Sequence, residues 1–180
     1  AEAHEAAWFL RAVAVKTAAG VCAALITVGI LTALGIETRE IRVVPDVTSA
    51  IVEALDTLRT RYTYVFTTGG IGPTHDDVTA DAVAAAFGVA LDVDQRAVDE
   101  MLKRYDRSEL NAARLRMARI PHGAELIENV VSYAPGFHIG NVFVMAGVPT
   151  VMQSMLDAVA PKLRTGEKMV AETIPPGLPE

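Results

Sequence analysis

The sequence predicts an α/β fold built on a parallel sheet. Two apolar runs, 40–44 and 63–68, are each followed by a segment in which apolar residues recur at helical spacing. Strands and helices that alternate in this way form parallel sheets with right-handed crossovers. A length of 180 residues is enough for one such domain with a sizeable core.

Composition narrows the classes of partner and compartment. The formal net charge of −6 provides no basic field that could hold a phosphate backbone, so we expect no nucleic-acid partner. Cys22 is the single cysteine, so no disulfide can form within the chain. A reducing, cytoplasmic setting fits these features best.

The segment 17–36 has twenty residues and no charged side chain. That length can span a bilayer, so a membrane anchor is one interpretation. Five alanines, three glycines and three threonines make the segment only weakly hydrophobic, however. A buried strand followed by a buried helix explains the run as well, and we favour it over the anchor.

The first clear strand, 40–44, ends at Pro45, and an amphipathic helix follows it. Thr48 or Ser49 can cap this helix. Its apolar side chains share one face: Ile51, Val52, Leu55 and Leu58.

The second strand, 63–68, runs into a glycine-rich turn at 69–79. An alanine-rich helix follows this turn and stops at Gly88. The turn therefore joins the carboxyl end of a strand to the amino end of a helix.

Two more helices are expected at 95–105 and 109–118, with Asp94 and Ser108 as their caps. Basic residues gather in them and next to them, in the stretches KRYDR, 103–107, and ARLRMAR, 113–119. On helices of mixed sign such charges usually form a solvated face, and we interpret them so.

Gly140 and Asn141 separate two short apolar runs within 136–147. This pattern predicts a β-hairpin at an edge of the sheet. Pro149 then starts a helix that extends to about Leu163, because proline is well tolerated in the first helical turn.

The glycine turn, residues 69–79, is the most distinctive stretch of the chain. Gly69, Gly70 and Gly72 allow positive φ angles and bring backbone N–H groups close to a ligand. The helix that follows adds its positive dipole end, so the turn favours a phosphate or a carboxylate. The turn is neither a Walker loop, since no lysine follows, nor a dinucleotide-binding GxGxxG.

Asp76 and Asp77 would repel a phosphate unless a cation lay between them. Mg²⁺ held by one or two carboxylates and by phosphate oxygens is a common solution. The alternative is that one aspartate caps the helix while the other is solvated. Asp46, which follows the preceding strand, could add a third carboxylate or be a helix cap.

A second strand-to-helix connection lies at 147–149, where Gly147, Val148 and Pro149 could bind the other side of the same ligand. On spacing alone, a plain tight turn explains these three residues slightly better. His75 could act as an acid or a base, although an exposed loop histidine is usually only solvated.

The stretch TTGGIGPTHDDVTADAVAAAFG resembles the signature of the MoaB/Mog molybdopterin-binding fold. The similarity is strongest to the branch formed by the N-terminal domain of competence/damage-inducible protein A (CinA). The segments VVPD, APGF and NVFVMAGVPTVMQSML occur in the same order as in that branch. The resemblance covers about residues 31–163 and implies a three-layer αβα sandwich with a mostly parallel sheet, often assembled as a homo-oligomer such as a dimer or trimer.

The resemblance also implies site residues. Asp46 and Asp77 match the functional aspartates and are the expected catalytic residues, and Asp76 and Asp77 are the expected metal ligands. The expected phosphate-binding residues are Thr68, Gly69, Gly70, Gly72, Pro73, Thr74, Thr79, Gly147 and Pro149. Met145 and Ala146 replace the Leu-Pro that usually precedes the glycine of the second loop.

The chain departs from the family pattern at both ends. Members of the branch begin with a strand and a Gly-Asp-Glu-Ile-Leu turn, whereas residues 12–36 contain no acid and no asparagine. Either a different strand keeps the fold without the ligand groups, or this segment is translated out of its ancestral frame. We expect one domain over 1–163, divergent over 1–30, and a tail or truncated C-terminal extension over 164–180.

The expected function is binding of a small molecule, either a molybdopterin or a nucleotide diphosphate, with Mg²⁺. Relatives suggest hydrolysis or transfer at a phosphoanhydride, as in molybdenum cofactor biosynthesis or ADP-ribose cleavage. The alternative is a non-catalytic ligand-binding or regulatory domain that has lost the N-terminal catalytic corner.

Overall fold

A six-stranded sheet with the order β2-β1-β3-β8-β7-β6 organises the chain. The computed structural model describes residues 5–11 and 18–164. Within the sheet, β1, β2, β3 and β8 are parallel, whereas β7 is antiparallel to β8 and β6 is antiparallel to β7. The strands of this sheet are β1 (Glu5–Arg11), β2 (Glu37–Val44), β3 (Tyr64–Thr68), β6 (Glu125–Ile127), β7 (Gly136–Ile139) and β8 (Val142–Met145). A separate antiparallel pair joins β4 (Leu91–Val93) to β5 (Arg119–Pro121).

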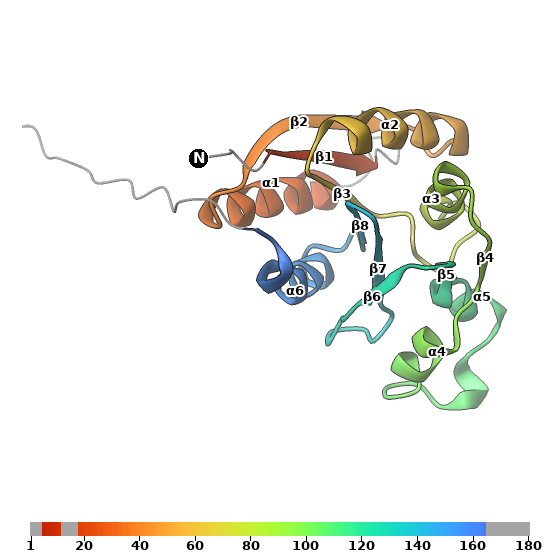
Figure 1. Ribbon diagram of the computed structural model, residues 1–180. Coiled ribbons are helices and arrows are strands. Elements are labelled where there is room, and N and C mark those ends of the chain that lie inside the picture. Colours follow the sequence, from red (N-terminus) through yellow and green to blue (C-terminus); the bar gives the residue numbers. More distant parts are fainter. Residues whose placement is uncertain (1–4, 12–17, 165–180) are drawn as a thin grey trace, which may run out of the picture.

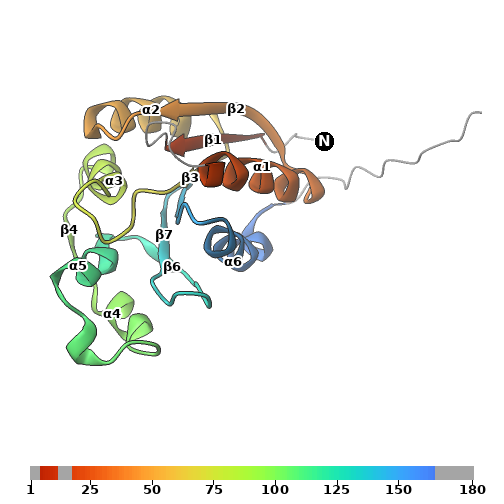
Figure 2. The ribbon, with the colours of Figure 1, turned by 180° about the vertical axis from the view of Figure 1, so that it is seen from behind.

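Helices cover both faces of the sheet. The α-helices are α1 (Ala18–Ala33), α2 (Thr48–Arg61), α3 (Thr79–Phe87), α4 (Gln95–Met101), α5 (Ala112–Leu115) and α6 (Pro149–Val159). Short 3₁₀ turns are η1 (Arg107–Glu109), η2 (Arg116–Ala118) and η3 (Ala160–Lys162). Helices α1 and α6 lie side by side under one face, and α2 and α3 lie toward the other (Figures 1 and 2). This arrangement confirms the predicted αβα sandwich.

Each face of the sheet has its own apolar core. On the side of α1 and α6, Phe66 and Phe143 stack with ring centroids 5.2 Å apart, next to Met152 and Leu156 of α6. On the side of α2 and α3, the buried residues include Leu55, Leu58, Val83 and Val144. At about 25 cal/mol per Å² of apolar surface, burial of this kind is the main stabilising term for both layers.

Strand β1 lies between β2 and β3 in the sheet. The sequence patterns predicted no strand at this position. The segment 17–36 likewise differs from the expected strand and helix, because α1 occupies most of it as one helix of 16 residues. Among the described residues, no helix is long and apolar enough to cross a membrane.

The strand in β1 agrees with the first explanation for the divergent N-terminus, a different strand that keeps the fold. Part of the segment in which the Gly-Asp-Glu-Ile-Leu turn is missing, residues 12–17 of 12–36, is outside the described residues. The expected tail also lies outside them from residue 165 onward.

Most of the later elements agree with the patterns that predicted them. Helix α3 ends at Gly88, whose φ of 64° is the left-handed conformation of a glycine C-cap. Asp94 caps α4 through a hydrogen bond from the Arg96 amide. The hairpin of β7 and β8 turns at Gly140, with φ of 56°.

Several details of the sequence prediction are wrong, beginning with the helix caps. Neither Thr48 nor Ser49 caps α2, because the helix begins after Val47 and no side chain makes the capping bond. Ser108 lies within η1, and the helix expected over 109–118 is broken. The break arises because the side-chain Oδ1 of Asn111 accepts from the Arg114 amide and so starts α5 there.

The β7–β8 hairpin lies one strand inside the sheet edge. Strand β6 pairs with β7 and forms the edge instead. Its three residues are too short to give a pattern of their own. In the same way, α4 ends at Met101, four residues earlier than expected.

Candidate functional site

Two loops meet where the parallel strands β3 and β8 end. The Gly69 amide donates a hydrogen bond of 2.9 Å to the Met145 carbonyl. A methyl group placed on Gly147 would lie 3.2 Å from the Cα of Gly69, so the two backbones almost touch. The carboxyl edge of parallel strands is the usual ligand-binding edge of an open α/β sheet.

The glycines of the glycine turn serve two different needs. Gly69 and Gly70 have φ angles of 87° and 76°, a conformation that favours glycine. Gly72 is not among the positive-φ glycines, so the expected conformational role is wrong at this position. Its lack of a side chain is required for space instead, because a Cβ there would lie 2.6 Å from Oδ2 of Asp77.

The Asp77 carboxylate folds back over its own turn. Its Oδ2 accepts hydrogen bonds from the Thr74 amide at 2.9 Å and from the Thr74 hydroxyl at 2.6 Å. Helix α3 begins after Val78 and has no side-chain cap, so Asp77 is not the helix cap of the alternative interpretation. These hydrogen bonds therefore hold the Asp77 carboxylate next to Gly72.

Asp76 and His75 form the exposed tip of the turn. The His75 Nε2 lies 2.9 Å from Asp76 Oδ1, and the His75 side chain is 92% exposed. The tip therefore places Asp76 toward solvent while its neighbour Asp77 is held inward.

Buried threonine hydroxyls surround the base of the glycine turn. The side chains of Thr68 and Thr79 are 2% and 0% exposed, and Thr67 is equally buried. Their hydroxyls have no hydrogen-bond partner among the residues that the structure describes. Buried hydroxyls without partners are rare, and a bound ligand or water normally satisfies them.

The carboxylates of the turn fit Mg²⁺ only together with a ligand. Among the described residues, no group of three or more His, Cys, Asp or Glu side chains gathers as a metal cage. Mg²⁺ commonly takes one or two carboxylates and completes its shell with water and phosphate oxygens. An ion held by Asp76 and Asp77 would need water or ligand oxygens to complete its shell.

Asp46 lies apart from the glycine turn. It follows β2, and β1 separates β2 from β3 in the sheet. The segment that connects β1 to α1 at this edge, 12–17, is outside the described residues. The structure therefore brings together the 69–79 and 147–149 loops, and leaves Asp46 two strands away.

Arg116 and Arg119 were interpreted from sequence as solvated surface charges, and that interpretation is wrong. The Arg116 guanidinium donates to two backbone carbonyls of the glycine turn. Arg119 pairs with Asp81 in the first turn of α3. No local pattern could have indicated either contact, because the partners are about forty residues away along the chain.

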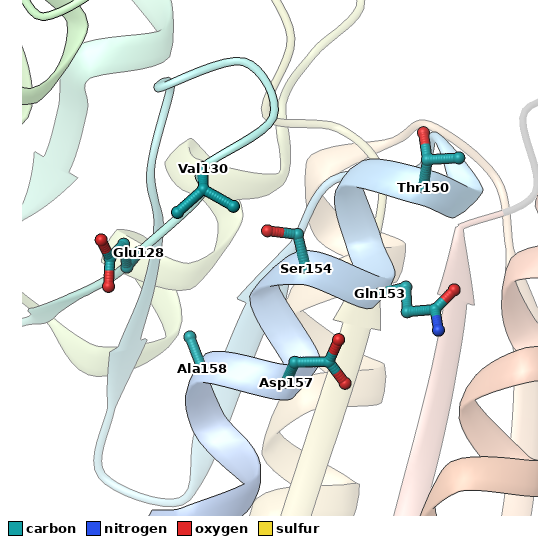
Figure 3. Close-up of a pocket in the computed structure, with 7 residues that line it drawn as sticks. All are labelled: Glu128, Val130, Thr150, Gln153, Ser154, Asp157 and Ala158. Carbon is teal, nitrogen blue, oxygen red and sulfur yellow. The ribbon is translucent and has the colours of Figure 1, made fainter.

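A hollow of about 390 Å³ lies elsewhere, between α6 and the connection that follows β6 (Figure 3). Its lining residues are Glu128, Val130, Thr150, Gln153, Ser154, Asp157 and Ala158. Only Thr150 adjoins the 147–149 loop, so this hollow is not the predicted ligand site.

Comparisons with known proteins match the fold and the order of the motifs. The sequence pattern of the family described as "probable molybdopterin binding domain" matches residues 23–165. A protein from Caldivirga maquilingensis is 37% identical over 141 residues, which are 75% of this chain and 55% of that relative. A protein from Archaeoglobus fulgidus is 36% identical over 137 residues, 76% of this chain and 58% of the relative. The chain thus spans about half the length of the curated relatives it matches.

Solved structures of CinA, MoaB and Mog proteins have a similar fold. The protein CinA of unknown function from Thermoplasma acidophilum superposes with a TM-score of 0.78 and 30% identity, covering 89% of this chain and 98% of that one. The molybdopterin biosynthesis enzyme MoaB from Thermus thermophilus has a TM-score of 0.55 and 18% identity, covering 89% and 91%. The Mog protein of Mycobacterium ulcerans has a TM-score of 0.54 and 19% identity, covering 89% and 92%. At these identities the last two show a shared fold.

Proposed function

Because the chain belongs to the family of probable molybdopterin-binding domains, we propose that its glycine turn binds the phosphate groups of a molybdopterin or a nucleotide diphosphate. The second loop, 147–149, contacts the other side of the same ligand. The carboxylates of Asp76 and Asp77 would hold Mg²⁺, which would offset the negative charge of the phosphates.

One observation carries the proposal: the Asp77 carboxylate is held over a bare glycine backbone, where two strand-end loops touch. A Cβ at Gly72 would lie 2.6 Å from Asp77 Oδ2, so a side chain there would have to displace the carboxylate. The unpartnered hydroxyls of Thr68 and Thr79 give further support, since they can donate to a phosphate. The amino end of α3 adds a favourable dipole.

If the bound ligand is cleaved, the bond broken would be a phosphoanhydride, and Asp77, the amides of the turn and Asp46 would have different roles. Bound Mg²⁺ supplies charge neutralisation at the phosphate oxygens. Asp77 and the backbone amides of the turn would orient the phosphates. Asp46 follows β2, two strands away, and would orient the attacking water only if the ligand extends across the end of β1.

A second candidate function is ligand binding without catalysis. The observation that favours it is the lack of any acid or asparagine over 12–36, where relatives of this branch carry a polar turn. Binding without release of AMP from ADP-ribose would identify this second function.

The first test is calorimetric titration with ADP-ribose and with a stable molybdopterin analogue, each with and without Mg²⁺. We expect Mg²⁺-dependent binding of one ligand, and at least a tenfold weaker affinity in Asp77→Asn. Asparagine keeps the volume and can still accept from Thr74, so this variant isolates the charge.

Asp99→Asn is the matched control, because Asp99 is an exposed aspartate on α4 that bonds only within its helix in the described contacts. Wild-type affinity in Asp77→Asn would show that the site lies elsewhere. Absence of binding in the wild type would remove both ligand classes.

A homo-oligomer remains part of the proposal. Exposed apolar side chains on the edge strand β2, Ile41 and Val43, support contact with another copy. Sedimentation velocity of the full chain distinguishes a dimer or trimer from a monomer.

A further inference from the structure

Two arginines reach the glycine turn from a part of the chain about forty residues away. Arg116 lies in η2, and Arg119 opens β5 one short helical turn later. The Arg116 Nε donates to the Thr74 carbonyl at 3.1 Å, and its Nη2 donates to the Asp77 carbonyl at 3.4 Å. One guanidinium therefore bonds both ends of the segment 74–77.

This segment is the part of the turn that fixes the Asp77 carboxylate. The Thr74 amide and hydroxyl both donate to Asp77 Oδ2, and the Asp77 amide donates to the Thr74 carbonyl at 3.2 Å. The Arg116 guanidinium adds hydrogen bonds to the backbone carbonyls at both ends of this segment. Its fork of fixed N–H groups suits two carbonyls at once, which a lysine ammonium cannot match in geometry.

Arg119 holds the next part of the same connection. Its Nη2 pairs with the Asp81 carboxylate in the first turn of α3. The two arginines thus attach the turn and the helix that follows it to η2 and β5, which pack on α3 through Ala118 and Ile120.

The tip of the turn is not packed into either apolar core. Pro73, Thr74, His75 and Asp76 are all exposed, so no apolar core holds them in place. Segments with few buried contacts open locally at low cost in free energy. Loss of the Arg116 bonds should therefore loosen the turn and leave the stability of the domain almost unchanged.

We propose that Arg116 is a positioning residue, which holds the glycine turn in the conformation that binds the ligand phosphates and Mg²⁺. This inference rests on the proposed function of the turn. Arg116 acts through the backbone carbonyls of Thr74 and Asp77.

The test compares Arg116→Gln, Arg116→Lys and the control Arg114→Gln. Arg114 is two residues away and bonds to Glu109, so its replacement removes the same charge without touching the turn. We expect Arg116→Gln to bind ADP-ribose or the molybdopterin analogue with Mg²⁺ about tenfold more weakly, Arg116→Lys to fall between it and the wild type, and Arg114→Gln to bind normally.

The second readout needs no ligand. Backbone ¹⁵N order parameters of residues 74–77 should drop toward flexible values in Arg116→Gln, while those of β3 stay at rigid values. Unchanged order parameters would overturn the inference, as would wild-type affinity in Arg116→Gln. If the wild type binds neither ligand, the proposed function fails, and the order parameters alone decide whether Arg116 positions the turn.

Discussion

At the scale of single residues, the glycine turn is specified by space as much as by backbone conformation. Gly69 and Gly70 need their positive φ angles, as the sequence suggested. Gly72 needs to be bare because Asp77 Oδ2 occupies the place of a Cβ. This requirement could not be predicted from sequence, since it depends on where a side chain five residues later folds back.

We predict that Gly72→Ala disturbs ligand binding far more than it disturbs folding. The new methyl group must displace the Asp77 carboxylate, which breaks its bonds to Thr74, while the exposed turn can move without opening the core. Titration with Mg²⁺ and ligand should show a loss of at least tenfold in affinity, with a shift of less than about 1 kcal/mol in the free energy of unfolding.

Gly29→Ala is the matched control for this substitution. Gly29 lies within α1, and a Cβ there meets no atom within 4 Å. Alanine in that helix should stabilise the domain by about 0.5–1 kcal/mol and leave binding unchanged. Equal ligand affinity in Gly72→Ala and Gly29→Ala would contradict the role assigned to Gly72.

At the scale of elements, the sequence predicted those segments in which the glycine or proline at a boundary agrees with the spacing of the apolar residues. Helix α3 with Gly88, the β7–β8 turn with Gly140, and α6 with Pro149 are examples. Strand β1 could not be predicted in this way, because Glu5–Arg11 has no alternation and owes its conformation to pairing with β2 and β3. The contact of Arg116 with the glycine turn could not be predicted for the same reason, since only tertiary packing brings η2 to the turn.

The β7–β8 turn is tied to the connection between α2 and β3 by one side chain. The Asn141 Nδ2 donates to the Arg59 carbonyl at 3.0 Å and to the Tyr62 carbonyl at 2.8 Å. We predict that Asn141→Ala lowers the free energy of unfolding by about 1–2 kcal/mol, because two partly buried carbonyls lose their donor. Urea unfolding followed by circular dichroism measures this change.

Asn141→Asp separates the loss of donors from the loss of volume. At neutral pH the carboxylate can only accept, and it faces two carbonyl oxygens, so the destabilisation should equal or exceed that of alanine. A variant as stable as the wild type would show that the two hydrogen bonds contribute nothing net.

At the scale of the whole molecule, two carboxylates far apart in the chain link stability to pH. Hydrogen bonds from Arg42 and then from Tyr62 lower the pKa of Glu40 on β2. Hydrogen bonding to Arg96, whose guanidinium and amide both donate, lowers the pKa of Asp94 at the start of α4. In both cases the folded state favours the ionised form more than the unfolded chain does.

The two lowered pKa values predict that acid destabilises the folded domain. A carboxylate with a lowered folded pKa contributes its full stability above its unfolded pKa, about 4.3 for Glu and 3.9 for Asp, and loses it as the pH falls through the folded value. We predict that the free energy of unfolding decreases between about pH 5 and pH 3. Each of these partly exposed groups should account for no more than about 1 kcal/mol of that loss.

The double variant Glu40→Gln and Asp94→Asn tests this prediction. Both substitutions keep the shape and remove the titration, and asparagine still caps α4. Glu40 and Asp94 lie on different elements and share no partner in the described contacts, so their effects should add. Urea midpoints measured at pH 7 and pH 3.5 should differ less for the double variant than for the wild type. An equally steep loss in the double variant would assign the acid sensitivity to other carboxylates, with those of the exposed glycine turn as the next to replace.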